Sequence, residues 1–325
     1  MLKTINWGII GCGDVTEVKS GPAFNKIAGS RLQAVMRRDK EKAADYATRH
    51  NVPKWYNDGY ALIADPDVNA IYVATPPSSH EEYAIAAMEA GKPVYIEKPM
   101  TVNAASAKRI AAKAAATGVA VSIAHYRRQL PLFKKIKQLL DEKYIGDARF
   151  VNLELFQPVN AKGFEPRAGY WRLDPSVSGG GLFHDLSPHQ LDLMFYFFGE
   201  PVFISGTSIN QAHLYPADDT VAGTIRFVNG TVMNGAWCFT APPEAARDRC
   251  TIIGAGGTME FSIFTMERLS ISKNGRTEEI MFDPVPHVQQ PMIEKVAEYF
   301  RGEGTNPCSA EEGVTVMEMI DKFTI

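Results

Sequence analysis

The chain has 325 residues, of which 45% are hydrophobic and 22% are charged, a composition typical of a folded globular protein. A single hydrophobic core rarely grows beyond about 250 residues, so this length predicts two domains. The 34 basic and 37 acidic side chains leave a net charge of -3, which gives no electrostatic reason to expect nucleic acid or a membrane as a partner.

The sequence also argues against export. No apolar run approaches the ~20 residues that span a bilayer, and Ile5 to Ile10 predicts a buried strand at the start of the fold. The four cysteines, Cys12, Cys238, Cys250 and Cys308, lack CxxC spacing, which suits reduced thiols better than a disulfide or zinc framework. We therefore expect a cytoplasmic protein.

Up to about residue 124, short apolar runs alternate with amphipathic or Ala-rich stretches, a pattern typical of βαβ units and a parallel sheet. The expected strands are Ile5 to Ile10, Leu32 to Met36, Ala70 to Ala74, Val94 to Ile96 and Val119 to Ile123. The expected helices are Asp39 to His50, His80 to Ala90 and Ala104 to Thr117. These elements predict an α/β domain over residues 1–124.

The pattern changes after residue 145, where short alternating segments predict an antiparallel sheet. The expected strands are Ala148 to Phe156, Val202 to Ile209, Val221 to Val228, Thr231 to Phe239, Arg249 to Ile253, Gly257 to Phe261, Arg268 to Ser272 and Thr277 to Phe282. Asn229-Gly230 predicts a hairpin with a type I′ turn. Helices at Pro188 to Phe198, Val288 to Arg301 and Ala310 to Lys322 would cover one face of the sheet. Residues 125–325 thus predict an α+β domain, whose C-terminal helices can pack back on the first domain.

A glycine turn closes the first expected strand. Gly11 allows a tight turn, and Gly13 lets the backbone approach a pyrophosphate at the start of the helix that Asp14 and Val15 open. Thr16 departs mildly from the small residue usual at its position. A plain strand-to-helix turn is the alternative, but the position of the turn at the start of an α/β half favours dinucleotide binding.

The end of the second strand indicates which dinucleotide. NAD-binding units carry an acidic residue there, whereas this chain has Arg37 and Arg38. Guanidinium groups suit a 2′-phosphate through paired hydrogen bonds, which favours NADP(H) and leaves NAD(H) possible. The alternative is a solvated charge pair that begins a helix.

Two further strands end in polar residues. One runs into Thr75-Pro76 with His80 beyond it, and another runs into Glu97-Lys98. Open α/β sheets bind ligands at the carboxyl ends of their strands, so these residues are expected near the cofactor and Lys98 near the nicotinamide. By itself, a lysine after a strand is usually only solvated.

A polar run in the second half predicts the chemical site. Ser187-Pro188 predicts an N-cap and first helical residue, which puts His189 in the first turn and Asp185 just before it. The helix end favours neutral histidine and nearby carboxylates favour the cation, a balance that suits an acid/base catalyst. A capping and packing cluster is the alternative. We expect no metal, because metal pairs on helices are normally spaced by three or four residues, which argues against a site of His184, Asp185 and His189.

Together, the glycine turn, the Thr75-Pro76-Pro77 and Glu97-Lys98-Pro99 segments, and the run from Gly179 to Asp192 resemble the glucose-fructose oxidoreductase, inositol dehydrogenase and rhizopine-catabolism (Gfo/Idh/MocA) family over essentially the whole chain. The resemblance implies a Rossmann domain followed by a domain with an open-faced, mostly antiparallel sheet. It also implies Lys98, Asp185 and His189 as the catalytic residues and a cis peptide bond at Pro99.

The same resemblance implies hydride transfer between nicotinamide and a sugar, anhydrosugar or cyclitol, and Arg37 and Arg38 favour NADP(H) as the cofactor. Its substrate-side segments match Tyr126 and Arg128, and Trp171 and Arg172, together with the catalytic Asp185 and His189. A homodimer or homotetramer formed through the C-terminal sheet is the implied assembly.

Two other functions remain open. A glycosidase that keeps nicotinamide bound and acts by transient oxidation is one, but such relatives resemble NAD users, so Arg37 argues against it. A cofactor-sensing protein without turnover is the other, and the set of Lys98, Asp185 and His189 argues against it, because a sensor needs no proton-transfer groups.

Overall fold

The computed structural model describes residues 2–161 and 170–324. The chain forms two compact units, Met1–Arg127 with Val285–Met317, and Arg128–Pro284 with Glu318–Ile325. The chain first passes from the first unit to the second after Arg127, close to the boundary expected after residue 124. Residues 285–317, which the sequence division put in the second domain, cluster with the first unit.

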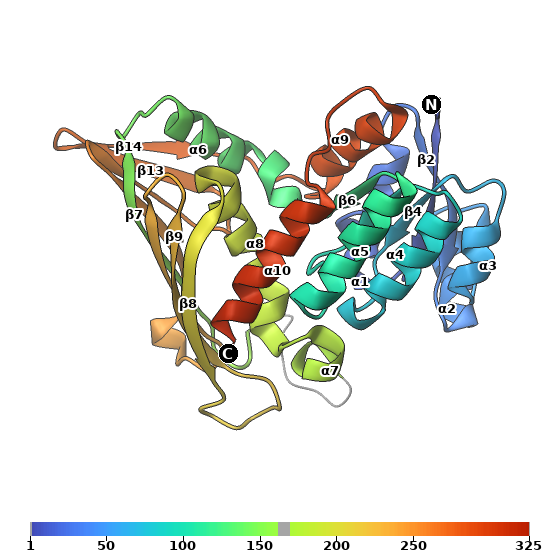
Figure 1. Cartoon of the computed structure of the whole chain (residues 1–325), viewed down its shortest axis with the longest axis horizontal. Helices are drawn as coiled ribbons and strands as arrows, with labels where there is room; N and C mark the ends of the chain where they lie inside the picture. The colour runs from blue at the N-terminus through green and yellow to red at the C-terminus, as the bar shows by residue number, and fades with distance from the viewer. Residues whose placement is uncertain (1, 162–169, 325) are drawn as a thin grey trace. The chain divides into compact units, whose positions relative to one another are not determined.

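The first unit contains a parallel sheet in the order β3-β2-β1-β4-β5-β6, which is the Rossmann order (Figure 1). Its strands are β1 (Ile5–Ile10), β2 (Ser30–Met36), β3 (Lys54–Tyr56), β4 (Ala70–Val73), β5 (Val94–Ile96) and β6 (Val121–Ile123). The five expected strands are confirmed to within a few residues. β3 was not expected, because at 3 residues it is too short to show a period.

Helices cover both faces of this sheet, because successive side chains of a strand point to opposite faces. Trp7 of β1 packs on Phe24 and Phe300, whereas a Cβ on the next residue, Gly8, would lie 2.5 Å from Leu62. The elements on the Trp7 face include η1 (Gly21–Asn25) and α9 (Gln290–Arg301), and those on the Gly8 face include α3 (Gly59–Ala64). The other helices of this unit are α1 (Asp14–Val18), α2 (Lys40–Arg49), η2 (Pro77–Ser79), α4 (His80–Glu89) and α5 (Ala104–Thr117). Two more helices, η3 (Tyr126–Gln129) and α10 (Ala310–Phe323), begin in this unit and end in the second.

The second unit contains a sheet in the order β14-β13-β12-β11-β7-β10-β9-β8, in which only the pair of β10 and β7 is parallel. Its strands are β7 (Ala148–Phe156), β8 (Pro201–Ile209), β9 (Thr220–Phe227), β10 (Val232–Cys238), β11 (Arg247–Gly254), β12 (Gly257–Phe261), β13 (Arg268–Lys273) and β14 (Arg276–Met281). All eight expected strands are confirmed. The hairpin at Asn229-Gly230 is also present, but a type I′ turn is wrong, because φ is positive at Gly230 (88°) and not at Asn229.

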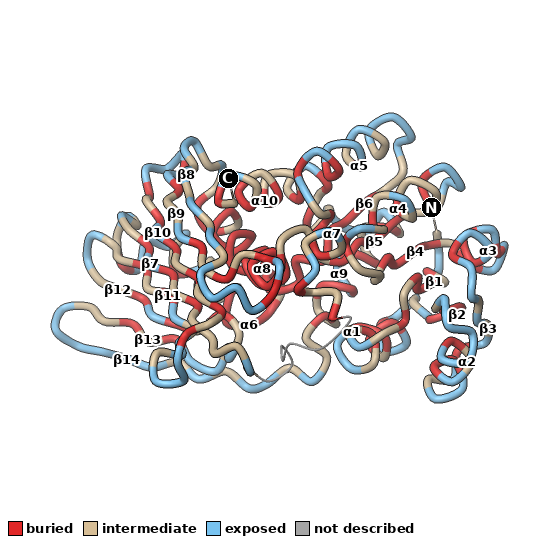
Figure 2. Tube along the Cα trace, turned by 90° about the horizontal axis from the view of Figure 1, so that it is seen from below, coloured by how far each residue is buried: buried red, intermediate tan, exposed pale blue. Residues whose placement is uncertain are grey.

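Helices α6 (Pro131–Asp141) and α8 (Gly181–Phe198) lie on the same face of this sheet (Figure 1). The shorter helices are η4 (Trp171–Leu173), α7 (Pro175–Ser178) and η5 (Pro243–Ala245). The inward side chains of β7 are Val151, Leu153 and Leu155, which are buried. Nearly every residue of α8 is buried as well (Figure 2).

The start of α8 differs from the start at Pro188 that the sequence predicts. The helix begins at Gly181 with Gly180 as its N-cap residue, so Pro188 lies inside the helix and not at its first position. A Cβ on Gly180 would lie 2.2 Å from the ring of His184, which explains why this turn needs glycine.

Among the described residues, every helix is too short or too polar to span a lipid bilayer.

Candidate active site

The two glycines of the first turn serve different purposes. Gly11 has a φ of 98°, and a Cβ there would lie 2.7 Å from the Thr75 amide nitrogen, so the fold itself requires glycine. A Cβ on Gly13 would meet nothing nearer than the Gly11 carbonyl oxygen at 4.0 Å. The space over Gly13 is therefore open to a ligand, as a dinucleotide pyrophosphate requires. Thr16 is buried and its hydroxyl donates to the Gly13 carbonyl oxygen at 2.8 Å, so it fits the turn.

Arg37 and Arg38 follow β2 directly. The Arg37 guanidinium is half-buried, and its Nη1 donates to the Cys12 carbonyl oxygen at 3.3 Å. Arg38 is exposed. Asp39 is the N-cap residue of α2 and accepts the Lys42 amide, so the arginines do not begin the helix. The structure thus puts one cation beside the glycine turn.

Thr75, Pro76 and His80 follow β4. Thr75 and Pro76 are partly exposed, whereas His80 is buried. The ring nitrogens of His80 lie 2.7 Å from the Thr75 carbonyl oxygen and 3.1 Å from the Pro99 carbonyl oxygen. Burial lowers the pKa of His80, and the carbonyl oxygens oppose this effect. His80 therefore joins the loops after β4 and β5 and does not turn its ring toward a ligand.

Glu97 and Lys98 follow β5. The Glu97 carboxylate is buried and accepts hydrogen bonds from the Tyr72 hydroxyl, the Gln289 amide and the Lys98 backbone N–H. The Glu97 carboxylate is thus bound within the first unit, and a contact between Glu97 and the cofactor stays a prediction. The Lys98–Pro99 peptide bond is cis, as expected. Gln289 was missed because nothing in its local sequence links it to Glu97.

In the second unit, α8 carries Asp185 and His189 one turn apart. Phe183 and Gln190 face the sheet, since both contact Trp237, and the Trp237 indole donates to Gln190 at 2.6 Å. Asp185 lies about 200° around the helix from Phe183, so Asp185 and His189 lie on the side away from the sheet. His189 is not in the first turn of α8, and the expected influence of the helix end on its protonation is wrong.

Trp171, Arg172 and Asp185 lie together. Arg172 Nε donates to Asp185 Oδ2 at 3.0 Å, and the guanidinium carbon is 4.4 Å from the centre of the Trp171 ring. Burial lowers the pKa of Arg172, but the charges and hydrogen bonds of Asp185 and Tyr170 together outweigh this effect, so the pKa is raised overall. This geometry combines an aromatic face, a cation and a carboxylate, which can bind a ring with several hydroxyl groups.

The sequence matches models of a known protein family in both units. A family model described as an oxidoreductase family with an NAD-binding Rossmann fold matches residues 5–125, and a GFO/IDH/MocA C-terminal domain model matches residues 133–260. Over 323 residues, the chain is 45% identical to oxidoreductase P35 of Formosa agariphila, covering 99% of each chain. The chain belongs to the GFO/IDH/MocA oxidoreductase family.

More distant relatives share this architecture. The chain is 26% identical over 295 residues to scyllo-inositol 2-dehydrogenase (NAD(+)) of Bacillus subtilis, covering 89% of this chain and 82% of that protein. A structure of levoglucosan dehydrogenase in complex with NADH has a TM-score of 0.88 and 22% identity, covering 98% of this chain and 96% of the other. As a member of this family, the protein is an oxidoreductase, an NAD(P)-dependent dehydrogenase or reductase.

Two expected substrate residues of this oxidoreductase are buried. Arg128 binds Asp192 in an ion pair, with Nη2 to Oδ1 at 2.7 Å and Nε to both carboxylate oxygens at 3.0 Å. Its guanidinium is therefore held by Asp192 within the second unit, and a substrate contact of Arg128 stays a prediction. Tyr126 is 5% exposed and packs under the Arg127 guanidinium at 5.5 Å.

Asp185 and His189 are four residues apart on α8, a spacing that a metal pair on a helix can have. Within residues 2–161 and 170–324, however, no group of three or more His, Cys, Asp or Glu side chains could hold a metal ion. Burial lowers the pKa of His184 to about 4, so its imidazole is neutral at physiological pH.

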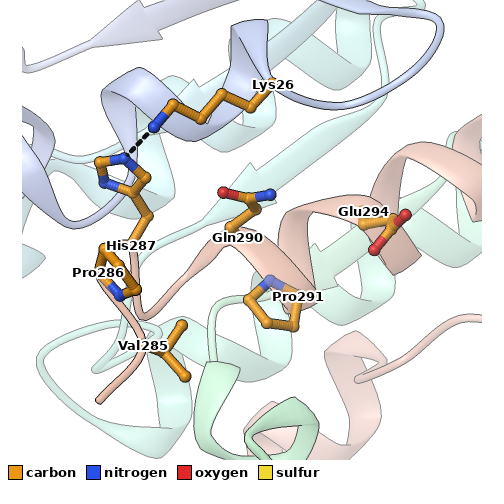
Figure 3. A pocket seen from close by; sticks show the side chains of 7 residues that line it. All are labelled: Lys26, Val285, Pro286, His287, Gln290, Pro291 and Glu294. Atoms are coloured by element: carbon orange, nitrogen blue, oxygen red, sulfur yellow. Dashed lines mark hydrogen bonds between the residues drawn. The ribbon is translucent and has the colours of Figure 1, made fainter. Parts of the chain in front are cut away.

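A surface hollow of about 310 Å³ lies in the first unit of the oxidoreductase, at the start of α9 (Figure 3). Its lining residues are Lys26, Val285, Pro286, His287, Gln290, Pro291 and Glu294. None of them is among the expected cofactor or substrate residues, so this hollow shares no residue with the candidate active site.

Proposed function

We propose that this enzyme transfers hydride between NADP(H) and a secondary alcohol or ketone of a sugar, anhydrosugar or cyclitol. One observation carries the proposal: Asp185 and His189 lie on the same side of α8, and there Asp185 binds Arg172, whose guanidinium lies over the ring of Trp171. Proton-transfer groups next to a polyol-binding surface are what this reaction needs.

The cofactor would lie along the carboxyl ends of the strands of the first unit. The open space over Gly13 supports a pyrophosphate there, held by the turn of Gly11, Asp14 and Val15. A guanidinium beside this turn supports NADP(H) over NAD(H), with Arg37 and Arg38 binding the 2′-phosphate. The remainder of the cofactor site would be lined by Thr75, Pro76 and the backbone of Glu97. His80 would fix the loops after β4 and β5 that carry these residues.

The bound nicotinamide supplies the hydride acceptor or donor. His189 would take the proton of the reacting hydroxyl during oxidation and return it during reduction. Asp185, held by Arg172, would bind neighbouring hydroxyl groups and orient His189. Lys98 would stabilise the charge that develops on the reacting oxygen. Trp171 would pack against the apolar face of the ring.

We also propose a cytoplasmic homodimer or homotetramer. The four cysteines are free, which suits a reducing compartment. Among the described residues, no helix covers the second face of the eight-stranded sheet, so that face can pair with another copy (Figure 1). Light scattering at working concentration tests the assembly, and a monomer contradicts it.

The function is tested by following nicotinamide absorbance with NADPH and NADH against a panel of keto-sugars, anhydrosugars and inosones. Lys98→Met is compared with wild type and with Lys113→Met, the same change on the exposed side of α5, where Lys113 pairs with Glu89. We expect reduction with NADPH preferred, no turnover by Lys98→Met, and normal turnover by the control. If no compound consumes either cofactor although one binds, the proposal fails and glycoside cleavage or sensing is tested next.

A further inference from the structure

A segment from the C-terminal part of the chain is anchored at the end of α1 in the first unit. His287 Nδ1 lies 2.7 Å from the Val18 carbonyl oxygen, so Nδ1 carries the proton, and Nε2 accepts from Lys26 Nζ at 2.5 Å (Figure 3). The Gln289 backbone N–H donates to the Lys19 carbonyl oxygen at 3.3 Å. These contacts fix the backbone from which the Gln289 side chain extends.

The Gln289 side chain is completely buried and reaches the loop after β5. Its Nε2 donates to Glu97 Oε1 at 2.6 Å, and the Tyr72 hydroxyl donates to the same oxygen. The other oxygen, Glu97 Oε2, accepts the backbone N–H of Lys98 at 3.0 Å. Gln289 and Lys98 therefore hold the two oxygens of one buried carboxylate.

This arrangement restricts how the carboxylate can turn. Two donors from two elements bind Oε1, so rotation of the Glu97 carboxylate would break hydrogen bonds that burial makes costly to lose. Because Oε1 is fixed, Oε2 is aimed at the Lys98 N–H. A hydrogen bond to the backbone of Lys98 determines where its Cα lies and thus where its side chain begins.

We propose that Gln289 is a positioning residue for the reaction, which acts through Glu97 to fix Lys98. The inference rests on the proposed catalytic role of Lys98. Gln289 does not touch substrate or cofactor in this scheme. Displacement of a reacting group by about 1 Å can cost on the order of 100-fold in rate, so the loss of this hydrogen bond should lower kcat and leave the substrate KM nearly unchanged.

The test compares Gln289→Met with Gln290→Met, the same substitution at the next residue, whose side chain lines the surface hollow. The first readout needs no substrate: it is the backbone amide resonance of Lys98 in the NMR spectrum of the full chain. We expect Gln289→Met to shift this resonance and to lower kcat by about 100-fold, and Gln290→Met to do neither. An unmoved Lys98 amide in Gln289→Met overturns the proposal, whatever the enzyme turns over.

Gln289→Glu separates positioning from simple packing. Its carboxyl group can donate to Glu97 only when it is protonated, so the Lys98 amide shift and kcat should both return toward wild type as the pH is lowered. If Gln289→Glu is equally impaired at every pH, the proposal is contradicted. Gln289→Glu also provides the test if Gln289→Met fails to fold. If wild type reduces no compound, the proposed function fails, while the NMR comparison still decides whether Gln289 positions Lys98.

Discussion

The guanidinium of Arg37, at the end of β2, turns back to the glycine turn and donates from Nη1 to the Cys12 carbonyl oxygen at 3.3 Å. Cys12 lies between Gly11 and Gly13, so this contact keeps a positive charge next to the open space over Gly13. An aspartate at this position would instead repel a 2′-phosphate and could accept the ribose hydroxyls of NAD.

Arg37→Asp should therefore reverse the cofactor preference. Hydrogen bonds to charged groups contribute about 1.5–3 kcal/mol, so we expect the ratio of kcat/KM for NADPH to that for NADH to fall roughly tenfold to 100-fold. Steady-state kinetics with both cofactors measures the ratio. Arg31→Asp makes the same charge change at an exposed residue of β2 and should leave it unaltered. An unchanged ratio in Arg37→Asp would show that Arg37 does not bind the 2′-phosphate.

Alanine substitutions at the two turn glycines should have different effects. Gly11→Ala puts a Cβ at a positive φ and within 2.7 Å of the Thr75 nitrogen, so we expect a lower melting temperature. Gly13→Ala meets no such neighbour, so we expect near-normal stability but weakened NADPH binding, because the new methyl group fills the open space. Thermal unfolding and NADPH fluorescence titration measure the two effects. Normal cofactor binding by Gly13→Ala would refute the assigned pyrophosphate position.

The sequence predicted those parts of the fold that depend on local patterns. Long alternating or apolar strands were recognised, and so was the glycine turn after β1. The position of His189 was wrong because Pro188 is usually a first-turn residue, whereas here Gly180 begins the helix and the proline lies within it. Gln289 could not be found, because its bond to Glu97 joins residues 192 apart in sequence. The same limit applies to Arg128, whose partner Asp192 is known only once α8 is folded.

The ion-pair cluster around Glu17 predicts a pH-dependent stability of the first unit. Hydrogen bonds from Arg49, aided by His50, lower the pKa of Glu17 from 4.5 to about 2. A carboxyl group whose pKa is depressed by folding stabilises the fold above its unfolded pKa, and this contribution is lost as the pH falls toward its folded pKa. The melting temperature of Glu17→Gln should therefore lie below that of wild type above pH 4.5, and the difference should shrink toward pH 2.

Melting curves at several pH values measure this difference. Glu267→Gln, at an exposed residue of the second unit, should differ little from wild type at any of them. A gap between Glu17→Gln and wild type that stays constant from pH 7 to the acid limit would assign the effect to packing and not to ionisation.

Breaking the ion pair of Arg128 and Asp192 should lower the free energy of unfolding strongly, whereas replacing both residues with apolar ones should change it little. Both side chains are at most 3% exposed, so Arg128→Met leaves the carboxylate of Asp192 in a buried site without its main counter-charge. Breaking one partner of such a pair typically costs about 3–5 kcal/mol, whereas exchanging both for apolar residues is often neutral.

We therefore expect Arg128→Met to unfold at a clearly lower urea concentration than wild type and the double variant Arg128→Met/Asp192→Leu to recover most of the loss. Denaturation followed by tryptophan fluorescence measures the transitions, since Trp237 lies in the core of the same unit, where it binds Gln190 of α8. The Arg128 guanidinium lies over the rings of Phe195 and Tyr196. Equal destabilisation by the single and double variants would therefore mean that Arg128 stabilises α8 through the packing of its side chain on these rings and not through the charge of Asp192.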